Sequence, residues 1–263
     1  MPLLERSPEI KVHYETSGKD GPWITLVNGY ARPSTDFKAI SRFLSERGHQ
    51  VLTFDSRGAG KTDCPPGFTL AEIAEDITAL WDHLKIERSH LLGISFGGTI
   101  AITHAANSSR VSSLIVVSTA VCDKLLNIEK DPPPRDPRRL IMNFTRYFSK
   151  EFATKNSLLV QGFIRQVART FQDPELALGA RAQRDAMGEF DLKPLLPQIS
   201  CPCLVLHGEA DQVVSVDSGR KIASGIKSAK LESFAGIGHL LLVEMPTALY
   251  ERVHRFLQES SPK

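Results

Sequence analysis

Short hydrophobic runs alternate with longer amphipathic stretches along most of the chain. Each run is apolar on both faces, which is typical of parallel strands that are covered by helices on both sides. The runs are WITLVN at 23–28, QVLTFD at 50–55, and the segments 88–94, 111–119, 202–207 and, more weakly, 231–234. Helical patterns lie between them at 36–47 and 70–84, and a third follows the last run at 246–257. This alternation predicts an α/β fold with a doubly wound, mostly parallel sheet.

One long region interrupts the alternation. No buried strand pattern appears between Cys122 and about Pro197, where a proline-rich entry (132–137) precedes helical patterns at 140–152, 158–171 and 175–187. About 75 residues are too many for a loop. We therefore expect a helical lid inserted after the sixth strand, with 122–197 as the lid and with 1–121 and 198–263 as the core. Most aromatic residues of this region should pack among its own helices, and we expect Phe144 and Phe148 to contact a substrate.

Composition and charge narrow the class of protein. The chain has 263 residues, of which 41% are hydrophobic and 24% charged, with a net charge of +2. These values indicate a globular protein and give no support for nucleic-acid binding. The start lacks the apolar stretch of a signal peptide, and no apolar run approaches the roughly 20 residues that span a bilayer. We expect a cytoplasmic protein without membrane insertion. The composition does not indicate an oligomeric state.

The cysteines and the charge of the inserted region carry less information. Cys64, Cys122, Cys201 and Cys203 do not form a disulfide framework, and no second pair of ligand residues accompanies Cys201 and Cys203. We expect free thiols and no metal. Basic side chains slightly outnumber acidic ones across 123–197, which allows an anionic substrate.

The segment Gly93-Ile94-Ser95-Phe96-Gly97 is the most informative motif. It matches G-x-S-x-G between a predicted strand and a predicted helix, the context in which this motif presents a nucleophilic serine. An abrupt strand-to-helix turn strains the serine backbone, and glycines on both sides leave room for it. The sequence therefore predicts Ser95 as a nucleophile.

A serine nucleophile needs a histidine base that is oriented by a carboxylate. His239 stands in a glycine-rich loop between the last strand and the last helix, whereas packing or exposure accounts better for the other seven histidines. Asp211 follows the end of a strand, where open α/β sheets place their sites. Glu209, Asp217 and Asp123 are alternatives, of which Asp217 fits better as a first-turn carboxylate of a helix.

Backbone N–H groups can stabilise the oxyanion of an acyl-transfer intermediate. The residue after the nucleophile, Phe96, supplies one such donor. The loop after 23–28 begins Asn28-Gly29-Tyr30, which makes the N–H of Tyr30 the expected second donor. We also expect Asn28 and Gly29 to line the substrate site.

Together these segments resemble the α/β-hydrolases of the small, lidded kind, which include esterases, lactonases and C–C bond hydrolases. The resemblance covers a strand pair ending at Tyr14, the Asn28-Gly29 turn, the segment FDSRGAGKTD at 54–63 and the stretch from Asp191 to Pro202. It implies the same triad of Ser95, Asp211 and His239, and a lid at the position of the insertion. Many members carry His-Gly where this chain has Asn28-Gly29, and some enol-lactonases resemble it in carrying asparagine.

These observations predict a serine hydrolase that needs no cofactor and acts on a small-molecule substrate, cleaving a carboxylic ester or lactone through an acyl-enzyme. A C–C bond hydrolase of dioxo acids or an aminopeptidase would use the same triad. A ligand-sensing protein of low turnover, or a catalyst that uses His239 chiefly as a base, also fits the residues. Covalent labelling of Ser95 would distinguish these classes.

Overall fold

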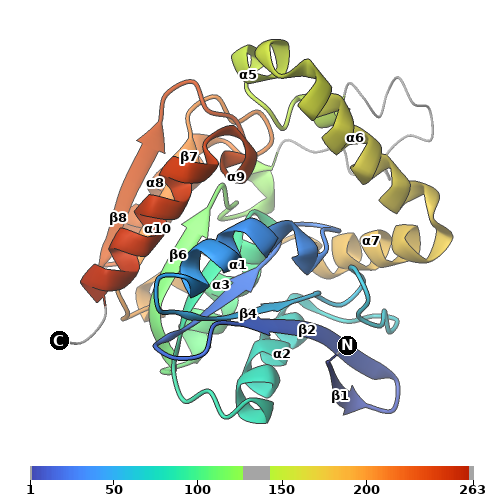
Figure 1. Ribbon diagram of the computed structural model, residues 1–263, viewed down its shortest axis with the longest axis vertical. Coiled ribbons are helices and arrows are strands. Elements are labelled where there is room, and N and C mark those ends of the chain that lie inside the picture. The colour runs from blue at the N-terminus through green and yellow to red at the C-terminus, as the bar shows by residue number, and fades with distance from the viewer. Residues whose placement is uncertain (1, 127–142, 261–263) are drawn as a thin grey trace.

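The computed structural model describes residues 2–126 and 143–260. Its strands form one sheet in the order β1-β2-β4-β3-β5-β6-β7-β8 (Figure 1). Strand β2 is antiparallel to both neighbours, and the pairs from β4 to β8 are parallel. The doubly wound, mostly parallel sheet is thereby confirmed. The strands are β1 Leu3–Ser7, β2 Ile10–Ser17, β3 Trp23–Val27, β4 Gln50–Phe54, β5 Ser89–Ile94, β6 Val111–Val117, β7 Cys203–Gly208 and β8 Ala229–Phe234.

The helices begin close to their predicted starts. Thr69 and Glu72 form a complete capping box at the start of α2, and Pro246 is the first residue of α10. The predicted helix at 36–47 is divided into a short 3-10 turn and α1. The helices are α1 Lys38–Ser45, α2 Leu70–His83, α3 Phe96–Asn107, α5 Lys150–Lys155, α6 Ser157–Gln172, α7 Pro174–Met187, α8 Val216–Gly225, α9 Leu241–Glu244 and α10 Pro246–Ser260, with 3-10 turns at η1 Ser34–Phe37, η2 Asp123–Leu125 and η3 Leu196–Gln198.

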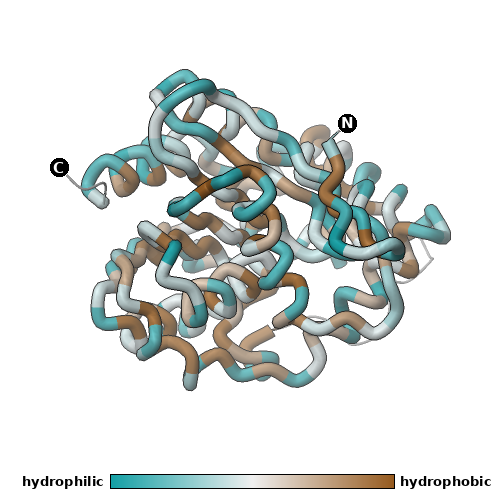
Figure 2. The backbone as a smooth tube through the Cα atoms, turned by 90° about the horizontal axis from the view of Figure 1, so that it is seen from below, coloured by the Kyte–Doolittle hydropathy of each residue, from teal (hydrophilic) through white to brown (hydrophobic). Residues whose placement is uncertain are grey.

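Alternate strand residues divide the core between the two faces of the sheet. Leu92, Ile115 and Leu204 pack with α1 and α10, whereas their neighbours Leu91, Leu114 and Val205 pack with α2, α3 and α8. Figure 2 shows hydrophobic segments running through the interior and hydrophilic turns at the outer edges. Burial on both faces explains why the strands are continuous apolar runs. The carboxyl ends of β3, β5, β6 and β7 consequently lie at one edge, which carries the candidate site.

Helices α5, α6 and α7, here called the inserted helices, lie between β6 and β7 in the chain (Figure 1). The predicted continuous helix at 140–152 is wrong over its described part, because residues 143–145 are helical, a turn follows, and Ser149 caps a new helix, α5. The carbonyl of Tyr147 in this turn accepts hydrogen bonds from the N–H groups of His239 and Leu240. The chain therefore bends to meet the core. Positions 127–142, with the proline-rich entry, lie outside the described residues.

Several further expectations concern the described part of the chain only. None of its helices is long and apolar enough to cross a membrane. Its His, Cys, Asp and Glu side chains form no group of three that could hold a metal ion. All four cysteines are free thiols, of which Cys122 and Cys203 are buried.

Two buried histidines should make the fold sensitive to acid. Burial lowers the pKa of His90 and of His104 to about 4. His104 lies 3.0 Å from the carbonyl of Ala74 and edge-on to Trp81, and His90 lies 2.7 Å from Ser113 Oγ. Both are neutral in the fold but become charged in the unfolded chain below pH about 6.5.

The unfolded chain therefore binds more protons between these pH values, and stability falls as the pH drops from about 6.5 towards 4, by up to about 3 kcal/mol per histidine. Urea unfolding between pH 7.5 and 4.5 measures this loss. His104→Gln should reduce its slope, since the variant has no group that titrates at that position. An equal slope in wild type and variant would contradict the assignment to His104.

Candidate active site

Ser95 lies at the sharp turn between β5 and α3. Its backbone has φ 54° and ψ −118°, a region that non-glycine residues rarely occupy. The turn requires glycine on both sides, because any side chain there would clash with the backbone. A Cβ on Gly93 would lie 2.3 Å from the carbonyl oxygen of Gly97, and a Cβ on Gly97 would lie 2.1 Å from that of Val27. The N–H of Ser95 donates to the carbonyl of Val117 at 2.8 Å. The turn thus holds the serine against the ends of β3 and β6.

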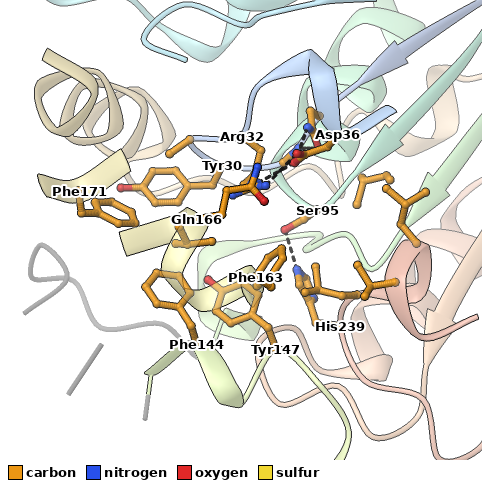
Figure 3. A pocket seen from close by; sticks show the side chains of 18 of the residues that line it. Tyr30, Arg32, Asp36, Ser95, Phe144, Tyr147, Phe163, Gln166, Phe171 and His239 are labelled. Atoms are coloured by element: carbon orange, nitrogen blue, oxygen red, sulfur yellow. Dashed lines mark hydrogen bonds and ion pairs between the residues drawn. The ribbon is translucent and has the colours of Figure 1, made fainter. Parts of the chain in front are cut away.

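The structure brings the three residues predicted for the triad together. Ser95 Oγ lies 3.0 Å from His239 Nε2, and His239 Nδ1 lies 2.8 Å from Asp211 Oδ2 (Figure 3 shows the first contact). Ser95 and Asp211 are contributed by the ends of β5 and β7, and His239 by the loop after β8. This is the geometry in which a carboxylate orients an imidazole towards a hydroxyl.

The His239 loop is anchored on both sides of the imidazole. The N–H of His239 donates to the carbonyl of Tyr147 at 3.0 Å, and its own carbonyl accepts from Ser118 Oγ at 2.9 Å. The ring of Tyr147 packs edge-on against the imidazole, with 5.3 Å between centroids. One of these anchors comes from the turn before α5, so the segment between β6 and β7 helps to place the histidine.

The side chain of Asp211 is fully buried and extensively hydrogen-bonded. Its Oδ1 accepts from the N–H groups of Val213 and Val214 at 2.8 and 2.9 Å. Burial raises the pKa of Asp211, but the charge of His239 and hydrogen bonds from His207, His239 and Val214 outweigh it and hold that pKa well below its usual range. Asp211 is therefore ionised at neutral pH.

His207 is a neighbour of this site that the sequence pattern did not identify. Its Nε2 lies 3.3 Å from Asp211 Oδ2 and 3.1 Å from the carbonyl of Val214. We expected His207 to be a packed strand residue, and it is fully buried in β7. A buried strand histidine four residues before the aspartate gives no sequence sign of this contact.

The alternative carboxylates lie in other environments. Glu209 accepts a hydrogen bond from Ser233 Oγ at 2.7 Å. Asp217 is in the first turn of α8 and pairs with Arg220, as its sequence position suggested. Asp123 begins the 3-10 turn η2. Among the described residues only Asp211 has a carboxylate oxygen bonded to the imidazole of His239.

The Gly29–Arg32 loop lies beside Ser95. A Cβ on Gly29 would lie 3.6 Å from the Cβ of Ser95. The N–H of Arg32 donates to the carbonyl of Gly29 at 3.2 Å, which closes a tight turn over Tyr30 and Ala31. Within the described residues, the N–H groups of Tyr30 and Phe96 have no hydrogen-bond acceptor. Both donors are therefore available to a ligand.

The amide of Asn28 is committed to the shape of this loop. Its Oδ1 accepts from the N–H of Gly29 at 2.8 Å, and its Nδ2 donates to the carbonyl of Pro33 at 2.7 Å and to Asp36 at 3.3 Å. Asp36 also binds Arg32 through two hydrogen bonds of 2.7 and 2.8 Å. Asn28 thus lines the site, but its polar atoms face its own loop.

A cavity of about 270 Å³, here called the main cavity, opens beside Ser95 and His239. Figure 3 shows the rings of Tyr30, Phe144, Tyr147, Phe163 and Phe171 gathered on one side of the Ser95–His239 pair. Asn28, Gly29 and Phe144, which we expected at the substrate, are among its lining residues. Phe148 is not: it is buried against Phe152 and Phe163 inside the inserted helices. The turn after residue 145 directs it away from the cavity.

Most of the cavity wall was not identified from the sequence. Helix α6 contributes Phe163, Gln166, Val167 and Phe171, and the segment around α9 contributes Leu240, Leu242 and Val243. An amphipathic pattern shows which residues of a helix are apolar, but not whether they face a neighbouring helix or a cavity. No sequence feature separates these residues from ordinary packing residues.

Comparison with known proteins agrees with this geometry. Residues 21–246 match the family model described as serine aminopeptidase, S33. The chain belongs to this family of α/β-hydrolases. It is therefore an enzyme of the α/β-hydrolase type, as its resemblance to that fold implied.

Relatives of this α/β-hydrolase catalyse different reactions. It is 29% identical over 204 residues to 3-oxoadipate enol-lactonase 1 of Acinetobacter baylyi, which covers 75% of this chain and 74% of the relative. It is 28% identical over 270 residues to a bifunctional esterase/perhydrolase of Acinetobacter calcoaceticus, which covers 94% and 95%. The enol-lactonase structure from Burkholderia xenovorans LB400 shares the fold, with a TM-score of 0.83, 24% identity and coverage of 98% and 100%.

Proposed function

We propose that this α/β-hydrolase cleaves a carboxylic ester or lactone through an acyl-enzyme on Ser95. The observation that carries the proposal is the continuous hydrogen-bond path from Ser95 Oγ through His239 to Asp211, with distances of 3.0 and 2.8 Å. These hydrogen bonds lie at the edge of a cavity, where they are not needed for packing. The backbone strain at Ser95 destabilises the fold, which favours a functional reason for this arrangement.

The residues divide the reaction into two balanced steps. In the first, Ser95 Oγ bonds to the carbonyl carbon while His239 Nε2 takes the hydroxyl proton, and the N–H groups of Tyr30 and Phe96 stabilise the oxyanion. The bond to the leaving oxygen then breaks, and this oxygen receives the proton from His239. In the second step His239 takes a proton from water, the hydroxide attacks the acyl carbon, and Ser95 leaves with that proton.

The charges around the main cavity favour an uncharged substrate group. Among its described lining side chains, the Lys, Arg, Asp and Glu residues are Arg32 and Asp36, and these two pair with each other. Burial raises the pKa of Tyr147 to about 12, so its phenol is neutral at physiological pH. This lining disfavours the anionic substrate that the charge of the inserted region allowed.

A second, smaller hollow that also reaches Ser95 supports a size rule for the substrate. It measures about 30 Å³ and shares Tyr30, Ser95 and Tyr147 with the main cavity. This volume is about one ninth of that of the main cavity, so the hollow admits only a small group. An ester with its carbonyl at Ser95 would thus place a large apolar group on one side and a small group on the other.

Turnover across a panel of substrates tests the proposal. Aryl acetates, methyl esters of aryl acids, esters that are bulky on both sides, lactones, dioxo acids and amino-acid anilides are compared at equal concentration. Esters with one large group and one small group should be cleaved fastest. Faster turnover of dioxo acids or amino-acid anilides would support a C–C bond hydrolase or an aminopeptidase instead.

The wall of the main cavity provides a specific prediction. Phe171 lines the cavity, stacks on Phe144 with 5.8 Å between centroids and lies beside Tyr30. Phe171→Ala should lower kcat/KM for an ester with a large aromatic group by about 10-fold, which corresponds to the lost apolar contact, and should change that of a small ester little.

Phe152→Ala is the matched control. It removes the same ring from the inserted helices, but Phe152 packs on Phe148 and does not line the cavity. The ratio of kcat/KM values for the two esters should stay as in wild type. A change of that ratio in Phe152→Ala as large as in Phe171→Ala would refute the proposed role of Phe171.

A further inference from the structure

One side chain of the inserted helices joins two loops of the core. Gln183 in α7 is fully buried. Its Oε1 accepts from the N–H of Ala31 at 2.8 Å, and its Nε2 donates to the carbonyl of Arg57 at 2.8 Å. Ala31 and Arg57 both lie far from Gln183 in the sequence, and both hydrogen bonds are buried. A glutamine on this face of α7 would otherwise be an unfavourable substitute for an apolar residue.

The loop that Gln183 holds is the one that carries the N–H of Tyr30. Ala31 has φ 54° at the second central position of the turn from Gly29 to Arg32, where glycine is strongly favoured. A left-handed backbone is unfavourable for alanine, because its Cβ comes too close to the following carbonyl oxygen. Contacts from outside the turn must therefore stabilise this conformation. Within the described residues, the N–H of Ala31 has one acceptor, Gln183 Oε1.

Helix α7 is seated closely enough to hold this loop in place. A Cβ on Gly179 would lie 2.1 Å from the carbonyl of Gly58, so the two backbones touch one turn before Gln183. The next residue, Arg184, places its guanidinium 5.4 Å from the ring centroid of Tyr30 and donates to its hydroxyl at 3.4 Å. Helix α7 thus contacts this loop at two points. Gln183 binds the backbone N–H of Ala31, and Arg184 contacts the side chain of Tyr30.

We propose that Gln183 is a positioning residue that fixes the direction of the Tyr30 N–H towards the oxyanion. The inference rests on the proposed function, because it assigns an oxyanion donor to Tyr30. Gln183 holds the peptide group between Tyr30 and Ala31. The hydrogen bond from the N–H of Arg32 to the carbonyl of Gly29 holds the rest of the turn. The inserted helices consequently contribute to the chemical step as well as to the wall of the main cavity.

Gln183→Met tests the assignment, since methionine matches the length of glutamine but can accept no strong hydrogen bond from Ala31. Loss of a whole oxyanion donor costs about 10²–10³-fold in kcat, and a misdirected one should cost about 10- to 100-fold with KM nearly unchanged. The inhibition constant of an aryl trifluoromethyl ketone, which forms an oxyanion on the serine, should rise by a similar factor. Gln183→Glu keeps an acceptor for Ala31 N–H and should retain more of kcat than Gln183→Met.

Ala180→Gly controls for stability, because glycine weakens the same helix at another buried position and takes away no hydrogen bond to the loop. All rates are divided by the folded fraction from thermal unfolding. Equal losses of kcat in Gln183→Met and Ala180→Gly, or a wild-type kcat in Gln183→Met, would overturn the inference. Failure of the proposed function is distinguishable, because the wild-type enzyme would then turn over dioxo acids or amino-acid anilides faster than esters and lactones, or would turn over none of these substrates.

Discussion

Ser95→Ala should reduce ester turnover by about 10⁴- to 10⁶-fold, because it removes the atom that forms the acyl-enzyme. The variant should fold normally. Alanine can occupy the same backbone conformation, and the one polar contact that is lost is the 3.0 Å bond to His239. Initial rates with an aryl ester, measured with high enzyme concentration, reach the required sensitivity.

Ser41→Ala serves as the control for this variant. Ser41 is a half-buried serine of α1, and the main cavity does not include it. The Ser41→Ala variant should retain the kcat and KM of the wild type. Residual turnover of Ser95→Ala within about 100-fold of wild type would mean that water attacks the ester directly with His239 as the base, and the acyl-enzyme would have to be abandoned.

Asp211→Asn should lower kcat by about 10³- to 10⁴-fold with a smaller change in KM. The asparagine can present its N–H₂ group to His239 Nδ1, which favours the tautomer with the proton on Nε2. That nitrogen then faces Ser95 as a donor and cannot take its proton. The variant loses no carbon atom, so the packing around β7 should be retained.

Glu209→Gln is the matched control, because it makes the same chemical change two residues away on a carboxylate that pairs with Ser233. It should leave kcat within about 2-fold of wild type. Asp123→Asn tests the alternative carboxylate, which follows β6 in the chain. Full activity of Asp211→Asn together with loss of activity in Asp123→Asn would place the acid of the triad on the other strand.

The parts of the site that depend on local sequence could be predicted. A strand-to-helix turn with glycines on both sides is a short-range pattern, and it predicts the position of Ser95 at the turn. The glycine-rich loop predicts His239 in the same way. Asp211 was one of four carboxylates in the sequence. Its contact with the imidazole depends on the parallel order of β6, β7 and β8, which brings the loops after β7 and β8 together.

The parts that depend on side-chain direction could not be predicted. Phe144 and Phe148 are four residues apart and would share one face of a continuous helix, but the turn between them sends one to the main cavity and the other to the packing between helices. Gln183 and His207 each make polar contacts that become visible only when distant segments meet. Hydrophobic periodicity records burial and contains no information on such partners.

Covalent labelling with a fluorophosphonate, followed by peptide mass spectrometry, tests the central claim most directly. The folded wild-type protein should acquire one adduct, on Ser95, at a rate that falls sharply in Asp211→Asn because His239 then no longer takes the hydroxyl proton. Heat-unfolded protein should acquire none. A folded protein that remains unlabelled, or whose adduct maps to another serine, would contradict the assignment of Ser95 as the nucleophile.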